Sequence, residues 1–83
     1  MSRYFFDLQN GDGPVRDDSG LELDSRAEIT REVGRILLDI ARDEIPEQPR
    51  GTASIVVRDD NGRAVSVANL TFSNLWLDDV APR

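Results

Sequence analysis

The chain lacks three side chains on which many small enzymes and metal sites depend. Its 83 residues include no cysteine, no histidine and no lysine, so all 10 basic residues are arginine. Without cysteine there is neither a disulfide framework nor a thiolate metal site, and without histidine there is no side chain suited to proton transfer near neutral pH. A zinc site, a Ser-His or Cys-His nucleophile and a Schiff-base lysine are therefore excluded within one chain. We expect no enzymatic activity and no cofactor.

Positive charge and long apolar runs are also scarce. The formal net charge is −6, and an acidic surface repels nucleic acid phosphates and anionic lipid. No apolar run approaches the roughly 18 residues of a membrane span, and no secretion signal is visible at the N-terminus. We expect a single cytoplasmic domain over residues 1–83, with a core at about 3–73 and a tail at 74–83, and neither nucleic acid nor a membrane as partner.

The first 23 residues predict a hairpin. Residues 3–10 read as a strand with Tyr4, Phe6 and Leu8 on one face and Phe5 on the other. Residues 10–14 are dense in glycine, asparagine and proline, which is turn chemistry, and residues 15–17 could return as a short second strand. A second turn at 17–20 then precedes the apolar residues of segment 21–23.

One long helix is predicted from Ser25 to Ile45. Ser25 and Glu28 match a capping box, and Pro46 ends the pattern. Apolar residues recur at helical spacing along one stripe: Ile29, Val33, Ile36, Leu37, Ile40 and Ile45. Gly34 lies beside this stripe, either to allow close approach to the sheet or as a tolerated weakness.

A second hairpin is predicted from strands at 53–58 and 64–72. A two-residue turn at Asn61-Gly62 places Ile55, Val57, Leu70 and Phe72 on the helix face without a bulge. A three-residue loop places Ile55, Val57, Val65 and Val67 inward instead, and a bulge is then needed further on. We favour the first alignment. The tail from Leu75 could continue the last strand or fold over a sheet edge.

These elements predict an α+β fold, a four-stranded and mostly antiparallel sheet in ββαββ order with one long helix packed on one face. Tyr4, Phe6 and Phe72 are then core residues, and the second face of the sheet stays open. We expect an apolar interaction surface on that face and in the tail, formed by Phe5, Val56, Val65, Val67 and Trp76. A homodimer that buries the two open faces together is the simplest way to cover it.

Acidic turns at Asp17-Asp18 and Asp59-Asp60-Asn61 are the candidate sites for a divalent cation. Neither has the spacing of an EF-hand loop, and aspartate favours turns in any case because it bonds to its own backbone. We therefore predict no metal site here and interpret both segments as solvated turns.

The opening Arg3-Tyr4-Phe5-Phe6-Asp7, the segment 16–23 and the turn 58–63 resemble a family of small proteins of unknown function that is abundant in alpha-proteobacteria. The resemblance extends through about Phe72 and implies a fold but no catalytic residues. A weaker, fold-level likeness is to the HicB-type antitoxin core, although the aromatic-proline signature and a DNA-binding segment are missing.

From these features we expect a small non-enzymatic protein-interaction or regulatory module that binds itself as a homodimer, an unidentified protein, or both. The alternative is an antitoxin-like or nucleic-acid-mimicking inhibitor whose acidic surface occupies a basic protein. A divalent metal binder is a remote third hypothesis.

Overall fold

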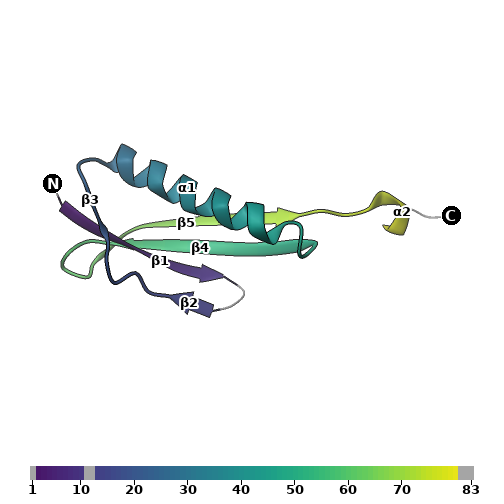
Figure 1. Ribbon diagram of the computed structural model, residues 1–83, viewed down its shortest axis with the longest axis horizontal. Helices are drawn as coiled ribbons and strands as arrows, with labels where there is room; N and C mark the ends of the chain where they lie inside the picture. The colour runs from purple at the N-terminus through teal and green to yellow at the C-terminus, as the bar shows by residue number, and fades with distance from the viewer. Residues whose placement is uncertain (1, 11–12, 81–83) are drawn as a thin grey trace.

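The structure, a computed structural model, describes residues 2–10 and 13–80. One long helix lies on one face of an antiparallel sheet with the strand order β2-β1-β4-β5, and β3 also pairs with β1 (Figure 1). The elements are β1 (Ser2–Asn10), β2 (Gly13–Val15), β3 (Leu21–Leu23), α1 (Arg26–Glu44), β4 (Arg50–Arg58), β5 (Ala64–Ser73) and α2 (Leu77–Val80). The expected α+β class is confirmed. The expected number of strands is wrong, because the sheet has five.

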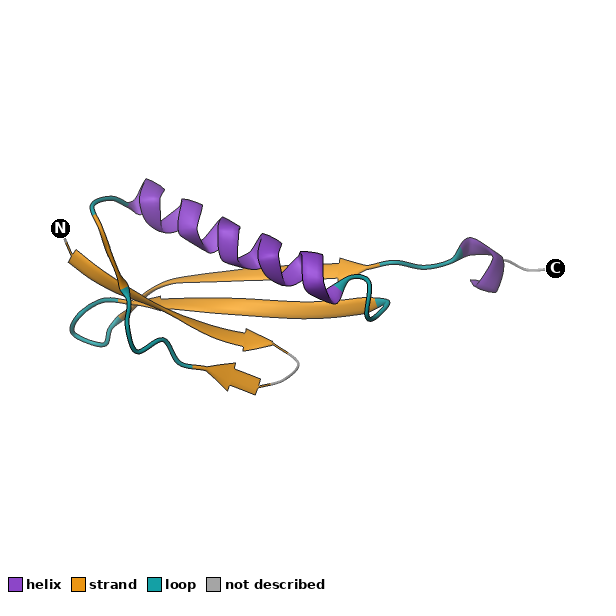
Figure 2. Ribbon diagram, in the orientation of Figure 1, coloured by secondary structure: helices purple, strands orange, loops and turns teal. Residues whose placement is uncertain are grey.

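The additional strand arises because the second strand is broken into two short pieces. β2 pairs with Leu8–Asn10 and β3 with Ser2–Tyr4, both along the edge of β1 that faces away from β4. Residues 16–20 between them leave the sheet as a loop (Figure 2). Of the expected strand at 15–17, only Val15 is in a strand. The middle of the expected turn at 10–14, residues 11–12, lies outside the described residues.

The helix follows its sequence signals closely. The Ser25 side chain accepts a hydrogen bond from the Glu28 N–H at 3.2 Å, and the Glu28 carboxylate accepts one from the Asp24 N–H at 3.0 Å. The first contact satisfies a donor that the first turn of a helix leaves without a partner, and the second ties the residue before the cap to that turn. Ile45 is the C-terminal cap and Pro46 follows it, so the predicted helix is confirmed with its two end residues as caps.

The core lies between α1 and the strands β1 and β4. Its buried members are Phe6, Ile29, Val33, Leu37, Ala41, Ala53, Ile55 and Val57. Tyr4 and Leu8 are half-buried against this cluster, as the alternation along β1 predicts. Phe72 lies half-buried opposite Gly51, so it closes the margin of the core rather than its centre. The core is densest at β4 and thins toward β5.

The second hairpin combines both alternatives considered for its register. Over most of its length it has the favoured alignment, with Ala53 opposite Leu70 and Val56 opposite Val67. The loop nevertheless closes over three residues, because Asp59 and Arg63 pair through a 2.9 Å hydrogen bond and Gly62 has φ +81°. An irregularity at Val57/Arg58 reconciles the two and leaves Val65 as the extra residue of β5.

The segment after β5 does not fold over the sheet edge. Asn74 still donates to the carbonyl of Pro49 at 2.7 Å, but the chain then leaves the sheet and forms the short helix α2. This segment projects from the end of the molecule at which α1 ends (Figure 1). Both expectations for the tail, continuation of the strand and cover of an edge, are therefore wrong for residues 74–80.

Substitution by alanine should have opposite effects on stability at Gly20 and at Gly34. Gly20 has φ +71°, and a Cβ there would lie 2.8 Å from the Tyr4 carbonyl oxygen and 2.9 Å from Phe5 Cε2. A Cβ at Gly34 meets no atom within 4 Å, so this glycine is a tolerated weakness and not a close approach. In urea denaturation we expect Gly20→Ala to lower the free energy of unfolding by at least about 1 kcal/mol. Gly34→Ala should raise it by up to about 1 kcal/mol. A stable Gly20→Ala variant would contradict the packing described here.

Candidate functional site

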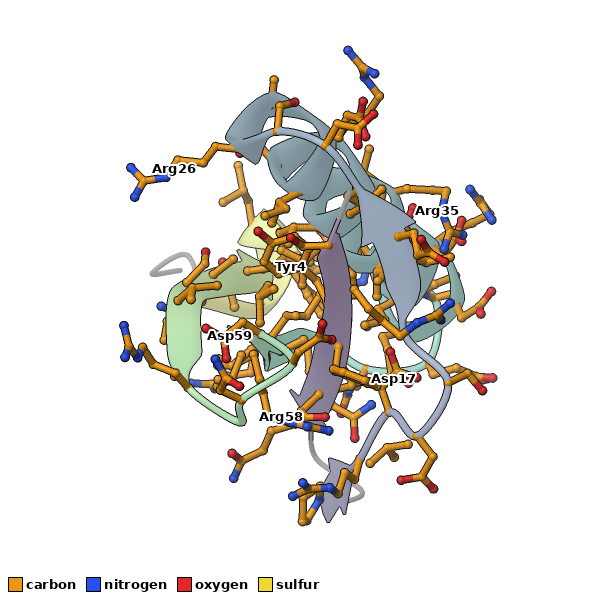
Figure 3. The ribbon with its side chains drawn as sticks, turned by 90° about the vertical axis from the view of Figure 1, so that its left-hand side faces the viewer. Tyr4, Asp17, Arg26, Arg35, Arg58 and Asp59 are labelled. Atoms are coloured by element: carbon orange, nitrogen blue, oxygen red, sulfur yellow. The ribbon has the colours of Figure 1, made fainter. Side chains whose placement is uncertain are left out.

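The N-terminal motif ends in an ion pair on the open face of the sheet. Arg58 on β4 donates to the two oxygens of Asp7 on β1, from Nε at 2.6 Å and from Nη2 at 3.1 Å. The same guanidinium lies over the ring of Phe5, 4.8 Å from its centroid. Figure 3 shows Arg58 on the side of the sheet opposite α1. The motif therefore joins β1 and β4 by side chains as well as by backbone pairing.

Asp17 in the loop 16–20 completes this network. Its carboxylate accepts hydrogen bonds from the backbone N–H of Phe6 at 3.0 Å and from those of Ser19 and Gly20, both at 3.1 Å. Its own N–H donates to Asp7 at 2.9 Å, and its carbonyl accepts from Arg58 at 2.9 Å. The Asp17 carboxylate thus accepts the hydrogen bond of the Phe6 N–H on β1. In a continuous second strand, a backbone carbonyl in the gap between β2 and β3 would accept it. We call the contacts among Asp7, Asp17 and Arg58 the aspartate-arginine lock.

The lock lowers the pKa of both carboxylates, Asp7 and Asp17. The hydrogen bond from Arg58 holds the pKa of Asp7 below its ordinary value of 3.8. Burial opposes ionisation of Asp17, but the N–H groups of Phe6, Gly20 and Ser19 together hold its pKa below 3.8 as well. Asp7 in turn raises the pKa of Arg58. All three groups are therefore charged under ordinary conditions.

In both acidic turns an aspartate side chain accepts hydrogen bonds from the backbone N–H groups of its own turn. Asp59 accepts hydrogen bonds from the N–H groups of Asn61 and Arg63, both at 2.9 Å, just as Asp17 serves its own loop. Among residues 2–10 and 13–80, no group of three or more acidic, histidine or cysteine side chains is placed to hold a metal ion. Asp17 and Asp59, which stand out in the sequence, thus hold the backbone of the two turns.

The five residues expected to form one interaction surface do not lie together. Val56 and Val67 are direct neighbours on the open face, but the Asp7–Arg58 pair separates them from Phe5. Val65 lies on the opposite face, where it lines a hollow with Tyr4. This reversal follows from the bulge, which changes the alternation of side chains at the start of β5. Trp76 lies beyond the far end of β5, beside Ile45 and Pro46.

A different apolar surface is present along β5 and the segment that follows it. Five of the nine exposed large apolar residues in the described part of the chain belong to it: Val65, Val67, Leu75, Trp76 and Leu77. The three consecutive tail residues are 61%, 70% and 75% exposed. The five residues follow one edge of the sheet and not one face, because Val65 and Val67 point to opposite faces and the three tail residues follow the far end of β5. We call these five residues the β5–tail surface. Sequence reasoning missed Leu75 and Leu77, although a run of three large apolar residues in a chain that is 31% charged was the available signal.

The outer edge of β5 is long and, apart from the bulge at Val65, lacks the features that usually protect an edge strand. Its ten residues include no charged residue and no proline. The opposite edge is short and interrupted, and it carries Pro14 and the charged loop 16–20. Charges, proline and short strands are the usual means of preventing an edge from pairing with another chain. Among residues 2–10 and 13–80, one edge of this sheet is protected, and the other is the outer edge of β5, which pairs with no further strand.

A hollow of about 350 Å³ lies at the first end of β5, under the start of α1. It is lined by Tyr4, Arg26, Ile29, Thr30, Val65 and Ser66. Arg26 projects from the helix to the side on which β5 lies, whereas Arg35 projects to the other side (Figure 3). We call this 350 Å³ hollow the Tyr4 hollow. It lies at the end of β5 opposite to the apolar tail.

This geometry defines a small α+β domain with one protected and one open sheet edge. The comparison with protein families places it more closely: residues 3–71 match the model described as "Domain of unknown function (DUF6894)", and the chain belongs to that family. No curated protein and no solved structure matches the chain. In the part of the chain that the structure describes, no helix is long and apolar enough to cross a membrane.

The lock predicts that Asp17 is more important to stability than its neighbour. Asp17→Asn removes one acceptor oxygen from a side chain that uses both, so it should lower the free energy of unfolding by roughly 1.5–3 kcal/mol. Asp18→Asn, at an exposed position in the same loop, should change it by less than about 0.5 kcal/mol. Chemical denaturation of the two variants gives the comparison. Equal losses would show that the carboxylate of Asp17 has no special role.

The same network predicts sensitivity to acid. Both carboxylates have a folded-state pKa below 3.8, so their contribution to stability is complete above that value and is lost as the pH falls through the lower folded pKa. We expect the thermal midpoint to fall steeply below about pH 4. Asp7→Asn should flatten this part of the curve. A wild-type midpoint that is independent of pH in this range would contradict the assignment.

Proposed function

We propose that this chain is a non-enzymatic protein-interaction module that binds its partner through the β5–tail surface. The observation that carries the proposal is the exposure of Leu75, Trp76 and Leu77, at 61%, 70% and 75%, next to an uncharged edge strand. Three consecutive exposed apolar side chains beside an uncharged sheet edge are typical of a surface that meets another protein.

The remaining features support binding rather than catalysis. The Asp7 and Asp17 carboxylates are held by Arg58 and by backbone N–H groups, which suits a structural role. The open face is divided by the same charged network. We therefore propose binding through the sheet edge and the tail, and not the face-to-face contact that we expected from the sequence.

The test compares two equivalent apolar-to-acidic substitutions. Leu77→Asp places a charge in the β5–tail surface, and Leu38→Asp places one on α1 at a position that is also exposed, at 65%. Tagged wild-type protein is incubated with untagged protein and with lysate of its host, and the retained species are identified by mass spectrometry. We expect a retained species, a second copy or another protein, that is reduced about tenfold by Leu77→Asp and unchanged by Leu38→Asp.

Retention that does not depend on Leu77 would show that this surface is not the binding site. Retention of no species, by either form of the protein, would contradict the proposed function altogether. Circular dichroism of both variants serves as the control for folding.

A further inference from the structure

We propose that the partner of the β5–tail surface is a second copy of this chain, paired antiparallel along β5 so that each tail lies against the Tyr4 hollow of the other copy. This inference rests on the proposed function and names its partner. It describes an edge-to-edge dimer with one continuous sheet, in which both helices lie on the same face.

The backbone of β5 permits this pairing. After the bulge at Val65, the strand is regular from Ser66 to Ser73, and its outer edge carries no charge and no proline. A two-fold axis perpendicular to the sheet pairs this stretch with its own copy, and isologous contacts of this type are the commonest in soluble oligomers. Residues opposite one another in an antiparallel pair point to the same face, so the axis must pass through a residue and not between two. Pairing as much as possible of the regular stretch from Ser66 to Ser73 then places the axis at Asn69 or Leu70.

The side chains match in either position of the axis: with the axis at Leu70, Ala68 of one copy lies opposite Phe72 of the other. Around Asn69, the half-buried Ala68 of one copy lies opposite Leu70 of the other on the helix face. The two thin margins of the core then meet and cover each other. On the open face, Val67 lies opposite Thr71 of the second copy. No charge is buried along the paired stretch, because β5 has none.

The ends of the molecule argue for a second copy rather than a different protein. The tail leaves one end of β5 (Figure 1), and the Tyr4 hollow, which Val65 and Ser66 line, lies at the other end. Antiparallel pairing brings each tail alongside the other copy's hollow, twice by symmetry. With the axis at Leu70, the paired stretch ends with Ser73 of one copy opposite Val67 of the other, so the tail begins near Val65 and the hollow of the other copy. Trp76 lies beside Ile45 and Pro46 at the end of α1, hence on the face of the sheet where the hollow opens.

Charge complementarity supports the same arrangement. The hollow carries Arg26, which projects on the β5 side of the molecule (Figure 3). The tail carries Asp78 directly after its apolar residues. Opposite charges at the rim of an apolar contact favour the correct alignment of partners. The antiparallel dimer brings this positive group and this negative group to the same end of the interface.

The first experiment measures mass and tryptophan emission together over a wide range of concentrations. Trp76 is the only tryptophan, so its emission reports the environment of the tail without labelling. We expect light scattering to give twice the monomer mass at high concentration, with a shift of the emission to shorter wavelength over the same range. A monomer at every concentration would overturn the proposal. A dimer without an emission shift would overturn the docking of the tail.

A matched pair of variants tests the edge contact. Asn69→Asp keeps the oxygen that accepts from Ser54 Oγ at 2.7 Å, so the fold should be retained, but it sets two negative charges on or next to the axis. We expect it to weaken dimerisation about tenfold or more. Gln9→Glu adds the same charge at an exposed position on β1, two strands away, and should leave dimerisation unchanged. Equal dimerisation of the Asn69→Asp variant and the wild type would overturn the edge-to-edge arrangement.

The outcome for the dimer is separable from that for the proposed function. If the wild-type chain is monomeric but retains another protein in a manner that depends on Leu77, the second-copy inference is wrong and the interaction module stands. If it is monomeric and retains no protein, both are wrong.

Discussion

The structure depends on the carboxylate of Asp17, which joins the loop 16–20 to the middle of β1. Its hydrogen bonds to the N–H groups of Phe6, Ser19 and Gly20 allow the second strand to break into β2 and β3 without leaving the edge of β1 unsatisfied. Arg58 then links this loop to Asp7 and to β4. A chain of this length buries only about 60–65% of its unfolded surface, so a polar network of this kind supplements a small core.

The lock also makes the two edges of the sheet different. One edge is short, interrupted and charged, and the other is a ten-residue strand without charge that continues into an exposed apolar tail. A free edge of this kind is prone to pair with another strand. The proposed dimer pairs the free backbone groups of β5 with those of a second copy, and it also covers the exposed apolar tail. In this view the motif that carries the family resemblance stabilises the fold, and the interface lies elsewhere.

Local signals were sufficient to predict the helix, and long-range contacts decided what could not be predicted. The cap at Ser25 and the apolar stripe gave the helix, and the alternation in residues 3–10 gave the buried face of β1. The break between β2 and β3 depends on a hydrogen bond from Phe6 to Asp17, eleven residues away, which no local pattern announces. The side on which Val65 lies depends on the bulge, and an error of one residue in register reverses a face. The tail carries no periodicity, so its course was not predictable.

Residue-resolved hydrogen exchange at two protein concentrations is the most direct test of this account, because it examines both edges at once. We expect the N–H groups of Phe6, Ser19 and Gly20 to be protected equally at both concentrations, since their acceptor Asp17 lies in the same chain. We expect alternate N–H groups of β5 from Ser66 to Ser73 to become protected only at the higher concentration. Unchanged rapid exchange of those β5 groups would contradict the account.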